Sequence, residues 1–264
     1  MSPVFPLTLA LYAVSCALYM AHAATSADRL ARSARLVLAG AFLSHAADIG
    51  ALCLHGIHPF VDGREALSFI AWLTVGAYLG VTLRHPLPLV GALLVPITMV
   101  LHVAARLAPS GTSAPQASTL LRLLHIGLAT AGVAVFAVAG VGALIYLGAE
   151  TQLKRHRFGA LFRQGPPLAT LDALNQTCIL LGFPLFTIAM ITGAIWVMRL
   201  PDGGVHRLLA PRYALSAIAW GLFATLLLAR RLGGWRGRRA ALLTLAGLGA
   251  ALCVVAIYFL RGPI

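Results

Sequence analysis

Residues 120–149, LLRLLHIGLATAGVAVFAVAGVGALIYLGA, form an apolar stretch in which Arg122 is the single charged residue. At a rise of about 1.5 Å per residue, this stretch is long enough to cross a hydrocarbon core of about 30 Å as an α-helix. Seven further apolar stretches flank it, at residues 4–23, 36–54, 66–83, 87–107, 174–198, 213–229 and 240–260. The sequence therefore predicts an all-α, polytopic membrane bundle of eight transmembrane helices, with residues 1–264 forming a single transmembrane domain.

The composition excludes most other classes of protein. Apolar residues make up 60% of the sequence and charged residues only 10%, whereas soluble domains carry about 25% charged residues. No phosphate-binding loop, dinucleotide fingerprint or nucleophile elbow occurs. The four cysteines form no CxxC or CxxCH motif, which argues against a zinc site or covalent haem attachment. We assign no catalytic residue from the sequence.

The net charge of +13 is explained by membrane topology rather than by nucleic-acid binding. The basic residues lie between the apolar stretches, thirteen of them in the loops that follow the odd-numbered stretches and seven on the other side. Positive residues concentrate on the cytoplasmic side of membrane proteins. We therefore expect lipid bilayer and not nucleic acid as a partner, a place in the bacterial cytoplasmic membrane, and both termini outside.

Three histidines, His45, His102 and His125, lie within the predicted spans, where ionisable groups are rare and are candidates for function. Imidazole is a common axial ligand of haem iron. The alternative is that each histidine simply forms hydrogen bonds with a neighbouring helix. Both interpretations stay open on these residues alone.

Charged residues accompany these histidines at helical spacing. Asp48 follows His45 by three residues, so it lies on the same face of the helix. Its carboxylate is a candidate to orient a ligating imidazole, to form a proton relay with His45, or simply to form a hydrogen bond that satisfies both groups. Arg106 and Arg122 lie within one turn of the other two histidines, near the outer boundary. Both arginines are candidates to pair with haem propionates or to reach lipid headgroups. His206, in an outer loop, is a further candidate ligand or propionate neighbour.

Four segments resemble the cytochrome c assembly family of membrane proteins, which includes CcsA, HemX and YpjD. They read LLHIGL at 123–128, PPLATLD at 166–172, ITGAIW at 191–196 and GWRGRR at 234–239. The resemblance is strongest over residues 120–245. It implies a haem-binding protein, with haem b as the cofactor. It implies that His125 corresponds to the first outer histidine of the family, that His45 resembles an intramembrane histidine of the YpjD-like members, and that Trp196 lies near the cofactor.

The sequence departs from the CcsA-type members in the outer loop. Those members carry a tryptophan-rich loop that ends in Trp-Asp-Pro-Lys, but here no tryptophan occurs between Trp196 and Trp220. Ala210-Pro211-Arg212 stands where Asp-Pro-Lys is expected, and residues 207–264 contain no histidine. The resemblance is therefore greater to the HemX and YpjD branch than to a haem-attachment synthetase.

Three functions follow as hypotheses. The first is a haem-handling membrane protein of cytochrome c biogenesis that lacks an intact haem-presentation loop, with other maturation proteins or apocytochrome c as candidate partners. The second is a HemX-like or YpjD-like accessory or regulatory protein without catalytic activity. The third is a small transporter with His45 and Asp48 as a proton relay. For the haem ligands, the adjacency of consecutive spans favours His102 with His125, whereas the resemblance favours His45 with His125.

Overall fold

The structure, a computed structural model, describes residues 4–54, 63–83, 86–107, 120–155, 165–199 and 211–261. Within these ranges the protein is helical and contains no β-strand. All eight apolar stretches become helices, and seven of these helices, all but α3, are long and apolar enough to cross a membrane. The predicted all-helical membrane bundle is confirmed. The helices are α1 (Phe5–Thr25), α2 (Asp28–Leu54), α3 (Gly63–Val81), α4 (Pro88–Leu107), α5 (Leu120–Lys154), α7 (Leu168–Met198), α9 (Pro211–Gly233) and α10 (Arg238–Arg261).

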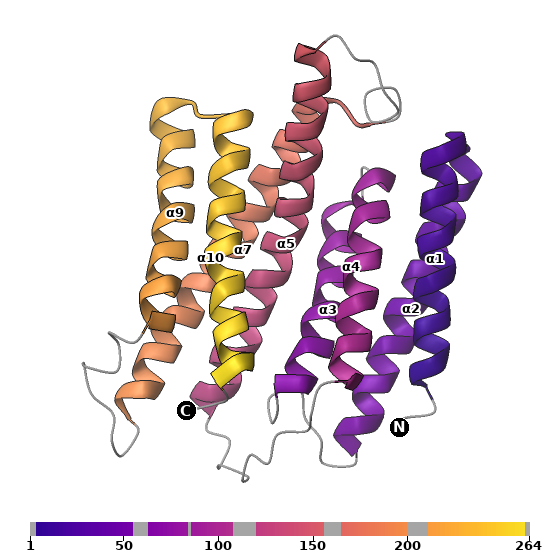
Figure 1. The fold of residues 1–264 in the computed structure, drawn as a ribbon. Coiled ribbons are helices and arrows are strands. Elements are labelled where there is room, and N and C mark those ends of the chain that lie inside the picture. Colours follow the sequence, from indigo (N-terminus) through magenta and orange to yellow (C-terminus); the bar gives the residue numbers. More distant parts are fainter. Residues whose placement is uncertain are drawn as a thin grey trace.

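The helices form two groups that lie side by side (Figure 1). In the first group, α1 packs against α2 and α4, and α3 packs against α4. In the second group, α5 packs against α7 and α10, and α9 packs against α10. Contacts between α3 and α5 join the two groups. The helix α5 therefore lies at the centre of the fold, which agrees with its being the most buried of the candidate spans.

Prolines mark several helix starts. Pro6 lies in the first turn of α1, Pro88 begins α4, and Pro167 immediately precedes α7. Proline is well tolerated there, because the first amides of a helix have no partner within the helix. Between α1 and α2, Ser26 takes a left-handed conformation with φ of 58°, so the polypeptide reverses within a few residues.

Glycines allow α5 and α7 to approach closely. A Cβ added at Gly182 of α7 would lie 2.6 Å from the Cε1 atom of Phe136 on α5. At Gly132 of α5, an added Cβ would lie 3.4 Å from the backbone nitrogen of Phe186. Phe136 also stacks on Phe223 of α9, with ring centroids 3.8 Å apart. Small residues thus create the room that the large aromatic rings fill.

The GWRGRR segment joins α9 to α10 and is held by a carboxylate of α7. The backbone N–H of Gly237 donates to Asp172 Oδ1 at 3.1 Å, and Arg230 Nη2 donates to the same oxygen at 2.9 Å. Gly237 has a φ of 65°, which favours glycine, and an added Cβ would lie 2.6 Å from the hydroxyl oxygen of Tyr146. The segment that carried the resemblance therefore has a structural role in closing the second helix group.

The topology gives a direct prediction. The helix α1 begins and α10 ends at the same end of the bundle (Figure 1), as an even number of crossings requires. Reporter fusions after residues 30, 85, 160 and 235 should report cytoplasm, and those after residues 60, 112 and 205 should report the outside, because of the distribution of basic residues. An odd number of crossings between residues 30 and 160 would contradict the eight-helix topology.

Candidate functional site

Four polar side chains, one from each helix of the first group, form a buried hydrogen-bonded series that we call the Tyr12–His102 network. The Tyr12 hydroxyl lies 2.9 Å from His45 Nδ1, and His45 Nε2 lies 2.9 Å from the Ser68 hydroxyl oxygen. That oxygen lies 3.4 Å from His102 Nδ1. The network thus runs from α1 through α2 and α3 to α4.

The network is enclosed by helices and aromatic rings. Tyr12, His45 and His102 are 0% exposed, and Ser68 is 3% exposed. The two imidazoles lie against each other, with ring centroids 4.1 Å apart and planes tilted by 57°. The ring of Phe5 packs on His102 with centroids 4.8 Å apart. Burial of so many polar atoms is expensive unless they bond to one another, as all of the polar side-chain atoms of this network except His102 Nε2 do.

An ion pair lies one helical turn from the histidines. Arg106 Nη2 donates to Asp48 Oδ2 at 2.6 Å, and the Asp48 side chain is fully buried. Arg106 also lies over the ring of Phe5, 5.0 Å from its centroid. Among the described residues, two buried polar atoms of these groups, Asp48 Oδ1 and His102 Nε2, have no hydrogen-bond partner.

These contacts differ from the arrangement suggested by residue spacing. Both ring nitrogens of His45 bond to hydroxyl groups, and Asp48 pairs with Arg106 instead of with His45. The Arg106 side chain is only 7% exposed and forms an ion pair with Asp48. In this arrangement its guanidinium group is therefore not available to pair with a haem propionate. His102 contacts His45, and no ring contact joins it to His125 among the described residues. The pairing of His102 with His125 as haem ligands stays a prediction.

His125 belongs to a second site, between the beginning of α5 and the end of α7. Its Nδ1–H donates to the backbone carbonyl of Ala189 at 2.7 Å. Because a carbonyl oxygen only accepts, this bond fixes the proton on Nδ1 and leaves Nε2 with a lone pair in the neutral ring. Gly193, one turn further along α7, provides the space for the ring, since an added Cβ would lie 2.5 Å from His125 Cε1.

Two other predicted residues meet at this second site. The ring centroids of His125 and Trp196 lie 6.2 Å apart. The guanidinium carbon of Arg122 lies 6.0 Å from the centroid of the Trp196 ring. The structure thus brings His125, Trp196 and Arg122 together from α5 and α7, whereas His206 lies outside the described residues.

The two histidine sites differ in how well they fit haem. An iron with two histidine ligands needs one imidazole on each face of the porphyrin, but the rings of His45 and His102 are in van der Waals contact. These two residues therefore do not fit as an axial pair. His125 does fit as one axial ligand, because a hydrogen bond from the other ring nitrogen is the usual way to orient a ligating imidazole. The hydrogen bond to Ala189 uses Nδ1 and so leaves the lone pair of Nε2 for a ligand.

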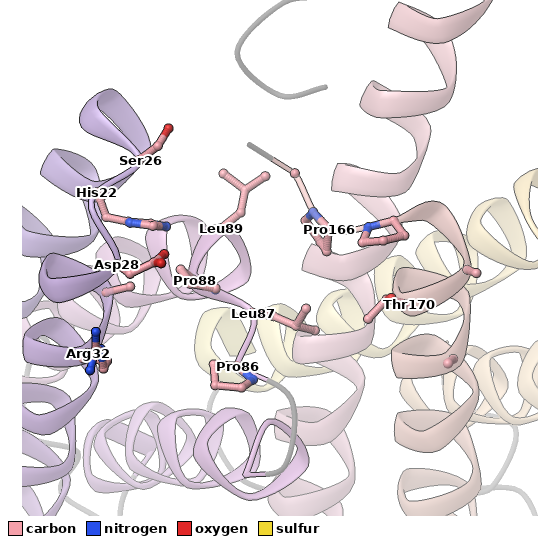
Figure 2. A pocket seen from close by; sticks show the side chains of 15 residues that line it. His22, Ser26, Asp28, Arg32, Pro86, Leu87, Pro88, Leu89, Pro166 and Thr170 are labelled. Atoms are coloured by element: carbon pink, nitrogen blue, oxygen red, sulfur yellow. The ribbon is translucent and has the colours of Figure 1, made fainter. Parts of the chain in front are cut away.

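An open cleft of about 1,110 Å³ lies at the other end of the bundle, where α1 ends and α4 and α7 begin. Figure 2 shows His22 and Asp28 on one wall, Pro166 and Thr170 on the opposite wall, and residues 86–89 between them. His22 Nδ1–H donates to the carbonyl of Ala27 at 3.0 Å. We refer to this end of the molecule as the cleft end.

The hydroxyl partners of the histidines, Tyr12 and Ser68, were not predicted from the sequence. A signal for the first was present in α1. Tyr12, Ser15 and Tyr19 are separated by three and four residues, and all three are buried on one face of α1. A polar stripe of this kind in an otherwise apolar helix indicates partners on neighbouring helices.

Comparison with known proteins gives one family. The family model described as "Cytochrome C assembly protein" matches residues 84–262. Relatives from several different organisms carry the same name. A cytochrome c biogenesis protein CcsA from Guillardia theta is 26% identical over 227 residues, which cover 78% of this protein and 75% of the relative. No solved structure gives a significant match.

Two further relatives carry the same name. The CcsA protein of Microcystis aeruginosa is 28% identical over 253 residues and covers 76% of this protein and 76% of the relative. That of Gloeobacter violaceus is 41% identical over 91 residues, which cover 34% of this protein and 26% of the relative. The long, weaker matches and the short, stronger match agree on a single family.

Proposed function

This protein belongs to the cytochrome c assembly protein family, and we propose that it acts in cytochrome c biogenesis by binding and handling haem, with His125 as a ligand of the iron. Its relatives from Guillardia theta and Microcystis aeruginosa are named cytochrome c biogenesis proteins. The family model covers both α5 and α7, the two helices that form the His125 site. The proposal therefore concerns the part of the protein that defines the family.

The observation that carries the proposal is the orientation of His125. Its Nδ1–H is held by the carbonyl of Ala189 at 2.7 Å, and Gly193 leaves room for the ring. This arrangement offers Nε2 as a ligand in a fixed direction, which reduces the entropy lost on binding. His125 Nε2 would hold the iron of haem, which takes imidazole nitrogen as a ligand.

Neighbouring residues suit a flat, anionic cargo. Trp196 places an indole ring near His125, and Arg122 adds a positive charge over that ring. A guanidinium group pairs well with carboxylates such as haem propionates. The four cysteines form no CxxCH motif, so we propose haem b, held without a covalent bond.

We further propose the bacterial cytoplasmic membrane as the location, with both termini outside. The protein is a multi-pass membrane protein, and the distribution of its basic residues supports this orientation. The His125 site then lies at the outer end of the bundle, because α5 begins and α7 ends there. Apocytochrome c and other maturation proteins would meet the protein on that side.

Deletion of the gene tests this function in cells. A strain without the gene should contain less covalently attached haem in its c-type cytochromes, as measured by haem staining of denaturing gels. The wild-type gene and His45→Ala should restore the amount, and His125→Ala should not. Normal c-type cytochromes in the deletion strain would contradict the proposal and favour a regulatory role.

The outer loop limits what the protein does alone. Because residues 197–219 contain no tryptophan and no Trp-Asp-Pro-Lys sequence, we predict that this protein cannot replace a CcsA-type synthetase. The measurement is covalent cytochrome c formation in a strain that lacks its own synthetase and expresses this protein. Restoration of c-type cytochromes there would overturn the prediction.

A further inference from the structure

The hydrogen bonds of the Tyr12–His102 network can all point in one direction. A neutral imidazole carries one N–H, so it donates with one nitrogen and accepts with the other, and a hydroxyl group does both. If the Tyr12 hydroxyl donates to His45 Nδ1, then His45 donates through Nε2 to Ser68, and Ser68 donates to His102 Nδ1. All bonds then point the same way, and the last N–H is on His102 Nε2. The reverse order satisfies the same distances.

The first of these two orders leads to an acceptor. His102 Nε2 is a buried atom without a partner, and so is Asp48 Oδ1. His102 lies one turn before Arg106 on α4, and Arg106 is bonded to Asp48. The last step of the path then needs one water molecule or a rotation of the ring to carry the proton from this donor to that acceptor. Arg106 lies next to the last residue of α4, at the end of the bundle opposite the cleft.

On the other side of the network, α1 carries polar groups toward the cleft end. Ser15, Tyr19 and His22 follow Tyr12 at successive turns of α1, each about 4.5–6 Å further along the axis. Ser15 and Tyr19 are buried, and the Tyr19 hydroxyl bonds to that of Tyr78 at 3.2 Å. His22 lines the open cleft (Figure 2). Ser15 donates to the backbone carbonyl of Ala34 at 3.0 Å. Polar side chains thus lie at intervals of one turn between the cleft and the network, and the hydrogen bonds of Ser15 and Tyr19 are to neighbouring helices.

We propose that the first helix group is a proton pathway, which takes a proton from the cleft at His22 and delivers it through the Tyr12–His102 network to Asp48 at the opposite end. Within the Tyr12–His102 network each group gives one proton and receives one, so one proton enters, one leaves, and nothing is oxidised or reduced. The path uses neither His125 nor haem. Failure of one of the two proposals would therefore leave the other unaffected.

Arg106 limits the pathway to transfer of a proton and excludes passage of a metal cation. Its guanidinium group lies at the last step, bonded to Asp48 and over the ring of Phe5. A fixed positive charge in a narrow, buried site repels other cations, whereas a proton moves along hydrogen bonds without carrying a hydration shell. Ser68 is the most informative position, because it is the single bridge between the two imidazoles.

Proton flux into liposomes tests the proposal. The full-length protein is reconstituted into liposomes that contain a pH-sensitive dye, and a potassium gradient with valinomycin drives protons inward. The wild-type protein should raise the rate of acidification above that of protein-free liposomes. Ser68→Ala should return the rate to that baseline, and Ser68→Thr, which keeps the hydroxyl group, should restore it.

Thr74→Ala is the matched control, because Thr74 is a buried hydroxyl residue of the same helix that bonds to the carbonyl of Ile70 and lies off the path. It should conduct protons like the wild type. Wild-type flux equal to that of protein-free liposomes would overturn the proposal. So would unchanged flux in Ser68→Ala, or an equal loss of flux in Thr74→Ala.

Discussion

Replacement of Arg106 by alanine should lower the free energy of unfolding by about 3–5 kcal/mol, the usual effect of removing one partner from a buried ion pair. The reason is that Asp48 is fully buried and its Oδ2 accepts from Arg106 at 2.6 Å. Without the guanidinium group, a carboxylate would remain in an apolar interior with no counter-ion. Unfolding of the purified protein by increasing fractions of SDS, followed by circular dichroism, measures the change.

Two variants separate this cause from a general loss of packing. Arg32→Ala removes an exposed arginine of α2, and it should leave the unfolding transition within about 0.5 kcal/mol of the wild type. The double variant Asp48→Asn with Arg106→Gln removes both charges, and it should recover much of the lost stability. Equal stability of Arg106→Ala and the wild type would show that the ion pair does not hold α2 to α4.

Gly193→Ala should weaken haem binding roughly 10- to 100-fold, the range observed when the groups that orient a metal ligand are removed. A Cβ at this position would lie 2.5 Å from Cε1 and 2.6 Å from Nδ1 of His125. The ring must therefore move, and its bond to the carbonyl of Ala189 is lost. Titration of haem into the purified protein, followed by absorbance, measures the affinity.

The control for this variant is Gly221→Ala on α9. An added Cβ at Gly221 meets no atom within 4 Å, and alanine favours the helix at both positions. Gly221→Ala should therefore bind haem like the wild type. If Gly193→Ala also keeps the wild-type affinity, the His125 ring does not contribute to the haem site.

The helices themselves could be predicted because the signal is repeated in every span. Each apolar stretch, from residues 4–23 to residues 240–260, becomes a helix, and all of these helices but α3 are long and apolar enough to cross a bilayer. The proximity of His125 and Trp196 could also be predicted, because both residues lie in the segments that resemble the family. Their helices, α5 and α7, pack together along glycines whose role is visible only in three dimensions.

The neighbours of His102 could not be predicted from spacing. Consecutive spans suggested that His102 would meet His125, but α4 packs mainly on α1 and α3, and this turns His102 toward Tyr12 and His45. Spacing within one helix likewise suggested that Asp48 serves His45. The carboxylate instead pairs with Arg106, because a charged partner from another helix offsets the cost of burial better than a neutral ring.

The central claim is that His125 is a ligand of bound haem in this family member. The most direct measurement is the absorbance spectrum, with the ratio of haem to protein, of the full-length protein purified in detergent from cells supplied with haem. We predict a Soret band in the wild type and in His45→Ala, and a lost or shifted band in His125→Ala, because loss of an axial ligand changes the coordination of the iron. A wild-type protein without a Soret band, or an unchanged spectrum and haem content in His125→Ala, would contradict the claim.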